Sequence, residues 1–313
     1  MQGKGRKVKK AALIILALLL LASCSQTESE DGRLKVTCTN FPACDAARAV
    51  FADRADIRMI LPYGGESHSY EPTGDDVIRI MESDLFIHSG GESEYFAQRI
   101  ISSLEGDVRT FALTENVSVL FTESDEGIIQ AEEEEEGEVY DEHVWTGISN
   151  EIDIISNLCA VACEMDPEGS AFYRANADSY ISELESLRSE FHGIVSAAKR
   201  RTIVVTDRFP LLYFASEFGL DYIAAYPGCA AETEVSARTV ASIIDYVREN
   251  DIPVVLHMEM ANTLLSRTVC DETGAKALEF SSCHNVPKRE GLAGVTYIDL
   301  MKRNTEVLKE ALN

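Results

Sequence analysis

The stretch DPEGSAFYRANADSYISELESLRSEFHGIVSAA, residues 166–198, decides the fold expected for this chain. Asp166 is suited to cap a helix, Pro167 to its first position, and Glu168 to the positive end of its dipole. Apolar side chains then recur at helical spacing: Phe172, Ala175, Ile181, Leu184, Leu187, Phe191, Ile194 and Ala198. At a rise of 1.5 Å per residue, a helix over 167–199 would be about 50 Å long and would be a rigid connector.

On both sides of this helix, short apolar runs alternate with helical patterns, which indicates parallel sheets covered by helices. Before it we expect strands at 34–37, 57–61, 85–88 and 117–121, with helices near 45–54, 74–82 and 94–104. After it we expect strands at 202–206, 222–225, 253–257 and 278–280, with helices near 236–250, 262–273 and 299–312. The predicted fold is therefore α/β, with two sandwich lobes, 33–166 and 200–313, joined by one long rigid helix. The cleft between two such lobes is a usual place for a small ligand.

The N-terminus predicts a lipoprotein signal over residues 1–23. Five basic residues precede an apolar run at 11–22, which is too short to cross a bilayer and has the length of a signal-peptide core. The run ends in Leu-Ala-Ser-Cys at 21–24, which resembles a bacterial lipobox. We therefore expect Cys24 to be acylated and inserted in membrane lipid, with 24–32 as a tether. An ordinary secreted protein with a chance cysteine is the alternative.

The chain is strongly acidic. It has 28 basic and 53 acidic residues, and removal of the five basic residues of the signal leaves 23 against 53, a formal charge of −30. Such a field excludes nucleic acid as a partner and favours cations. Eleven of the acidic residues lie within 123–142, so we expect a mobile loop over 123–140. This loop is either a solvated insertion or a weak cation-collecting arm.

Three of the six histidines fall where ligands are expected. His68 lies in a polar turn after a strand, His143 follows the acidic loop, and His284 follows the last strong strand of the second lobe. Neutral imidazole is a preferred ligand of zinc and its neighbours. His192, in the long helix, is expected at the surface or in packing. His88 and His257, at strand ends, are expected to pack, and the alternative is that they support a metal ligand.

Seven cysteines remain besides Cys24, and none has the paired spacing of a structural zinc site. An extracytoplasmic location permits disulfides. We expect a disulfide between Cys229 and Cys283 that steadies the loop carrying His284.

Several segments resemble the zinc- and manganese-specific solute-binding lipoproteins of ABC transporters. They are TNFP at 39–42, GESHSYEPT at 65–73, DEHVW at 141–145 and DYIAAYPGCAAETE at 221–234. The resemblance covers nearly the whole mature chain. It implies two α/β lobes joined by a rigid helix, one metal ion bound between them, and delivery of that ion to permease and ATPase subunits.

The metal site carries over only in part. The first two histidines of that family fall on His68 and His143. The third should stand five residues before Tyr213, where this chain has Arg208, and the place of the fourth ligand, a carboxylate, falls on Ser281. We therefore predict His284 as the third ligand and Arg208 as the partner of a carboxylate. The oxygen candidates for a fourth ligand are Asp207, Glu232 and Glu234, with Glu259 also nearby.

The sequence thus predicts an extracytoplasmic, lipid-anchored binding protein that captures a divalent metal, Zn²⁺ in the first place, for an ABC importer. A manganese-binding member of the same family is one alternative, because carboxylates favour manganese. A surface-anchored zinc hydrolase or an adhesin is another. The chain has neither an HExxH nor a GxSxG motif, so we expect no enzyme activity.

Overall fold

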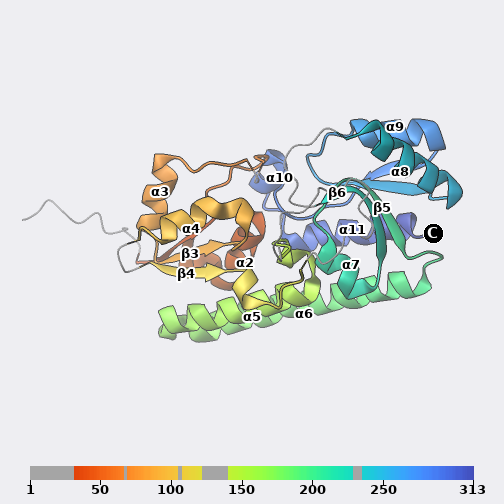
Figure 1. Cartoon of the computed structure of the whole chain (residues 1–313). Helices are drawn as coiled ribbons and strands as arrows, with labels where there is room; N and C mark the ends of the chain where they lie inside the picture. The colour runs from red at the N-terminus through yellow and green to blue at the C-terminus, as the bar shows by residue number, and fades with distance from the viewer. Residues whose placement is uncertain (1–31, 67–68, 105–107, 122–139, 228–234) are drawn as a thin grey trace, which may run out of the picture. The chain divides into compact units, whose positions relative to one another are not determined.

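The structure is a computed structural model that describes residues 32–66, 69–104, 108–121, 140–227 and 235–313 (Figure 1). The predicted signal peptide, Cys24, almost all of the tether and nearly the whole acidic loop lie outside these residues. Among the helices that are described, none combines the length and the apolar character needed to cross a membrane.

The first sheet has four parallel strands in the order β2-β1-β3-β4. Its faces are both covered. Leu85 and Ile87 pack toward α2, whereas Phe86 between them packs with Ile80 of α3 and Ala97 of α4. Such two-sided burial is typical of parallel sheets. The elements are β1 (Leu34–Cys38), α2 (Phe41–Phe51), β2 (Ala55–Met59), α3 (Gly74–Met81), β3 (Leu85–His88), α4 (Tyr95–Ile101) and β4 (Arg109–Ala112).

The second sheet repeats this arrangement, with parallel strands in the order β6-β5-β7-β8. Val204 and Val255 face a cluster that includes Ile243 of α8 and Val269 of α9, and the neighbouring strand residues face the main core. The elements are β5 (Thr202–Phe209), α7 (Leu212–Phe218), β6 (Asp221–Pro227), α8 (Ala237–Glu249), β7 (Val254–His257), α9 (Leu264–Thr273), β8 (Lys276–Glu279), α10 (Lys288–Leu292) and α11 (Tyr297–Ala311). The two predicted α/β lobes are confirmed.

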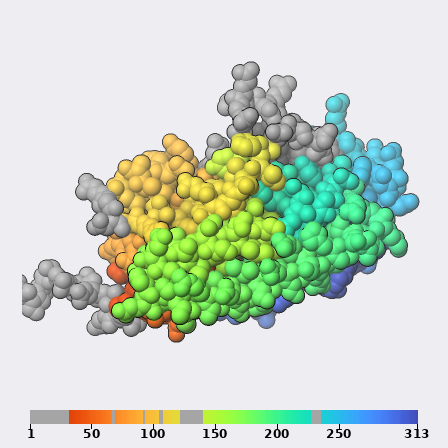
Figure 2. Space-filling model, turned by 90° about the horizontal axis from the view of Figure 1, so that it is seen from below, coloured from red at the N-terminus to blue at the C-terminus, as the bar shows by residue number. Residues whose placement is uncertain are grey.

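The predicted long helix is also confirmed. A 3₁₀ turn, Pro167–Gly169, leads into α6 (Ser170–Ala197). Helix α6 packs against α2 and α5 (Ile148–Met165) of the first lobe and against α7 and α11 of the second. Helices α5 and α6 run along the lower part of the face that Figure 2 shows.

The buried stripe of α6 differs at its start from the expected one. Phe172 is 37% exposed, and Tyr173 is fully buried in its place. The Tyr173 hydroxyl donates to Asp166 Oδ2 at 2.7 Å, so this aromatic ring can be buried without leaving its polar group unsatisfied. The same Asp166 caps the turn, as predicted, by accepting from the Gly169 amide.

One predicted strand is wrong. The fourth strand of the first sheet is β4, at Arg109–Ala112, and the apolar run 117–121 is not part of the sheet. Val117, Val119 and Leu120 pack partly buried on the core. The backbone of Leu120 is satisfied by Tyr213 and Asp141 instead of a neighbouring strand. An apolar run alone does not distinguish these two kinds of packing.

Candidate metal centre

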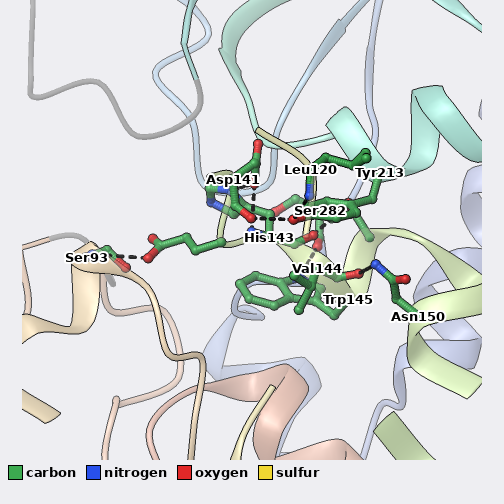
Figure 3. A network of polar contacts seen from close by, with 11 residues as sticks. Ser93, Leu120, Asp141, His143, Val144, Trp145, Asn150, Tyr213 and Ser282 are labelled. Carbon is green, nitrogen blue, oxygen red and sulfur yellow. Dashed lines mark hydrogen bonds and ion pairs between the residues drawn. The ribbon is translucent and has the colours of Figure 1, made fainter. Parts of the chain in front are cut away.

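His143 is fully buried immediately before a 3₁₀ turn, Val144–Thr146. Its amide donates to Asp141 Oδ1 at 2.7 Å, and its ring Nδ1 lies 2.8 Å from the same oxygen (Figure 3). Because the carboxylate is an acceptor, Nδ1 carries a proton, and in the neutral ring the lone pair is then on Nε2. Histidine ligands of metals are commonly oriented by a carboxylate in this way.

The segment that carries His143 is held from the second lobe. The Tyr213 hydroxyl of α7 donates to the Asp141 carbonyl at 2.6 Å and accepts from the Leu120 amide at 3.0 Å (Figure 3). On its other side, the Asn150 side chain donates to the Val144 carbonyl at 3.0 Å. The position of the imidazole is therefore fixed by side chains from both lobes.

His284 lies in the loop 281–285, between β8 and α10, and is 9% exposed. Glu259, which follows β7, holds this loop. Its carboxylate accepts from the Ser282 amide at 2.7 Å, the Ser282 hydroxyl at 2.7 Å and the His284 amide at 2.9 Å. Burial raises the pKa of Glu259, and the three bonds oppose that shift. The oxygen candidate Glu259 thus serves as a support for the loop.

The structure brings His143 and His284 together from opposite lobes. Their ring centroids are 5.4 Å apart, with the planes at 84°. Trp145 lies beside both, 5.4 Å from His143 and 5.0 Å from His284. Its indole Nε1 donates to the Ser282 carbonyl at 2.9 Å (Figure 3). The two imidazoles therefore lie side by side and are largely buried against Trp145.

The other predicted site residues divide into two groups. Asp207 Oδ1 accepts from the Arg208 amide at 2.8 Å, and its Oδ2 from the Met258 amide at 3.4 Å; burial raises its pKa. Arg208 Nη1 lies 3.7 Å from Glu66 Oε1, so it pairs with a carboxylate, as expected. The second group, His68, Glu232, Glu234 and Cys229, lies outside the described residues.

Cys283 is a fully buried thiol, and its disulfide with Cys229 stays a prediction. The remaining histidines pack. His88 stacks on Phe86 at 5.5 Å, and burial lowers its pKa to about 4, which keeps it neutral. His192 of α6 lies edge-on against Phe218 at 4.9 Å. His257 Nδ1 lies 3.0 Å from the Met258 carbonyl.

A buried polar cluster lies behind Trp145. Tyr297 at the start of α11 donates through its amide to Asp45 Oδ2 and through its hydroxyl to the Trp145 carbonyl, and Tyr180 also donates to Asp45. Glu151 is 1% exposed, and neither of its carboxyl oxygens has a hydrogen-bond partner among the described residues. Burial, together with the nearby charge of Asp45, raises the pKa of Glu151 well above its usual value.

A comparison with protein families identifies the chain. The model of ZnuA, the periplasmic component A of zinc-uptake complexes, matches residues 36–311. The chain belongs to this family. The resemblance recognised in the sequence is thereby confirmed.

Two ZnuA-family relatives show how far the similarity extends. The zinc-binding lipoprotein AdcA of Streptococcus pneumoniae is 27% identical over 307 residues, which cover 97% of this chain and 61% of AdcA. The chain therefore spans about three fifths of the length of AdcA. The high-affinity zinc uptake system protein ZnuA of Bacillus subtilis is 26% identical over 324 residues, which cover 97% of this chain and 98% of that protein.

Solved structures of the ZnuA family have the same fold. The Zn(II)-bound ZnuA-like domain of S. pneumoniae AdcA superposes with a TM-score of 0.75 at 25% identity, covering 90% of this chain and 99% of that domain. The laminin-binding protein Lmb of Streptococcus agalactiae, described as having adhesin and metal transporting activity, gives a TM-score of 0.75 at 23% identity over 90% of this chain. At that identity, the likeness to Lmb concerns the fold alone.

For this ZnuA-family chain, sequence reasoning missed the residues that support the histidines. Tyr213 and Trp145 reach across the lobes through a hydroxyl and an indole N–H, and nothing in their spacing indicates such contacts. In the described part of the chain, no three His, Cys, Asp or Glu side chains are close enough to hold a metal ion.

Proposed function

We propose that the protein captures Zn²⁺ outside the cytoplasm and delivers it to an ABC importer, with His143, His284 and His68 as ligands. The observation that carries this proposal is the approach of the His143 and His284 rings to 5.4 Å. Two imidazoles on one tetrahedral zinc, each with a Zn–N bond of about 2.0–2.1 Å, hold their ring centres roughly 5 Å apart. The spacing of the two rings therefore suits a shared zinc ion.

The surroundings of the two rings support zinc over manganese. Asp141 orients His143 so that Nε2 can act as a ligand, and imidazole suits zinc better than manganese. Asp207 has both oxygens directed at backbone amides of its own lobe. This favours Glu232 or Glu234 as an oxygen ligand.

Delivery to an importer follows from ligands in both lobes. An ion held by His143 and His284 joins the two lobes, so its presence can be sensed by a partner that contacts both. The permease and ATPase subunits of a zinc-uptake complex are partners of this kind. The match to a zinc-uptake component supports this assignment.

Metal analysis tests the proposal. We expect the purified protein to bind one Zn²⁺ per chain in calorimetric titration and elemental analysis, to bind Mn²⁺ more weakly, and to show no turnover of ester or peptide substrates. A protein that takes up no zinc at stoichiometric concentration would contradict the proposal. If the protein binds Mn²⁺ more tightly than Zn²⁺, the transported ion is manganese, and capture between the two lobes still holds.

The lipid anchor is tested separately. Because acyl chains on Cys24 would hold the protein at the membrane, we expect Cys24→Ala to be released or to remain unprocessed. Fractionation and intact-mass measurement would show the difference from the parent. A Cys24→Ala protein that is cleaved at the same place and still sediments with membranes would rule out anchoring through Cys24.

A further inference from the structure

The loop that carries His284 is fixed firmly to its own lobe. Besides the three bonds to Glu259, Asn304 of α11 accepts from the Ser281 amide and donates to the Ser281 carbonyl. The Cys283 backbone has a φ of +61°, and its amide donates to the Ser281 hydroxyl at 3.1 Å. With these contacts, the loop moves as one body with the second lobe.

Besides the bond from Trp145 to the Ser282 carbonyl, this loop binds the first lobe through Asn285. Its Nδ2 donates to the carbonyls of Pro62 and Gly65, each at 2.9 Å. Its Oδ1 accepts from the Val286 amide at 2.8 Å, and the residue is 1% exposed. Both amide hydrogens and the amide oxygen are thus used, and only an asparagine side chain supplies this combination at this length.

The receiving turn is shaped to present both carbonyls. The Gly65 amide donates to the Pro62 carbonyl at 2.9 Å, and Gly64 has a φ of +79°, a conformation that favours glycine. In the sequence, this turn leads directly to His68. One side chain of the second lobe therefore holds the segment that precedes the remaining predicted ligand.

A second contact between the first-lobe turn and the second lobe is weaker. Arg208 and Glu66 are 3.7 Å apart, and their side chains are 21% and 53% exposed. Ion pairs of this exposure contribute little. Asn285, which is buried and makes two short bonds, is the stronger connection.

We propose that Asn285 is a positioning residue that sets the separation of the two lobes across the metal site. This inference rests on the proposed function. With Asn285 in place, the first-lobe turn and the His284 loop stay in register, so a bound ion is released more slowly than it would be without these two bonds. Without it, the lobes separate more readily and the ion leaves sooner.

The test is Asn285→Asp in the full-length protein, purified in detergent and loaded with Zn²⁺. Aspartate keeps the shape and the acceptor for Val286 but faces two carbonyls with an oxygen in place of a donor. We expect zinc dissociation into excess chelator, followed by stopped flow, to be about 10–100-fold faster, the range typical of groups that support metal ligands. The association rate should change little.

Asn116→Asp is the matched control. The Asn116 side chain also donates to a backbone carbonyl, that of Ala112 at 2.7 Å, but entirely within the first lobe. It should dissociate zinc at the parental rate. Asn285→Ala removes the same two bonds without adding a charge, so its zinc dissociation rate should match that of Asn285→Asp. Agreement between the two variants would show that the faster rate does not come from misfolding of one of them.

The dissociation rate separates positioning from a merely structural role. A structural defect reduces the fraction of protein that binds zinc but leaves the rate of the remaining fraction unchanged. Parental dissociation rates in both Asn285 variants would overturn the inference and leave the proposed function standing. A parent protein that binds no zinc would overturn both.

Discussion

His143→Ala and His284→Ala are expected to cause the largest losses of zinc affinity. Each removes one of two imidazoles whose ring centres lie 5.4 Å apart, and loss of a proposed direct ligand should exceed the roughly 10–100-fold cost of altering a supporting group. His68→Ala should have a comparable effect. Calorimetric titration, with a competing chelator for the tightest binders, measures each dissociation constant.

Two further variants delimit this result. Arg208→Ala should weaken binding much less, because its side chain contacts Glu66 and a cation does not coordinate metal. His192→Ala should change nothing, since His192, on α6, packs against Phe218 of α7. If His284→Ala binds zinc like the parent, the second-lobe ligand is elsewhere, with Asp207, Glu232 and Glu234 the next candidates.

Glu151→Met is expected to stabilise the metal-free protein, and more so at high pH. A buried carboxyl group without hydrogen bonds costs about 1–3 kcal/mol even when neutral, and methionine fills a similar volume. The folded-state pKa of Glu151 is raised. Protonation of Glu151 therefore favours the folded state. This contribution to the free energy of unfolding is fully present below the unfolded-state pKa of about 4.3, and it is lost as the pH rises through the folded-state pKa.

Urea denaturation at pH 5 and pH 8 measures this difference. The gain in the free energy of unfolding should exceed about 2 kcal/mol at pH 8 and be smaller at pH 5. Glu185→Met, on the exposed face of α6, is the control and should stay within about 0.5 kcal/mol of the parent. A less stable Glu151→Met at both pH values would mean that this carboxyl has a favourable partner, such as a bound water.

Patterns that depend on periodicity predicted the architecture well. The third strand begins and ends where the apolar run LFIH at Leu85–His88 does, and α6 follows its apolar stripe over most of its length. The fourth strand was misplaced because Arg109–Ala112 has only two buried residues. Its place in the sheet depends on pairing with β3, a non-local contact that the sequence does not display.

The site was predictable only as far as residue type indicates chemistry. Imidazoles at loop ends pointed to His143 and His284, and the positive charge of Arg208 pointed to a carboxylate partner. The role of Glu259 could not be foreseen, because a carboxylate serves a metal or a backbone amide equally well. Which one it meets depends on where the Ser282 and His284 amides lie in three dimensions.

The first sheet precedes α6 in the sequence and the second sheet follows it, which affects the order in which the two sheets can form. Every strand of the first sheet comes from residues 34–112 and every strand of the second from 202–279. As the polypeptide emerges N-terminus first, the first sheet can therefore complete its pairing before any strand of the second exists. Helix α11 then docks on α6, and its Tyr297 reaches Asp45, 252 residues earlier in the chain. The contact between Tyr297 and Asp45 can form only after both lobes have emerged, so we expect it to be among the last contacts made.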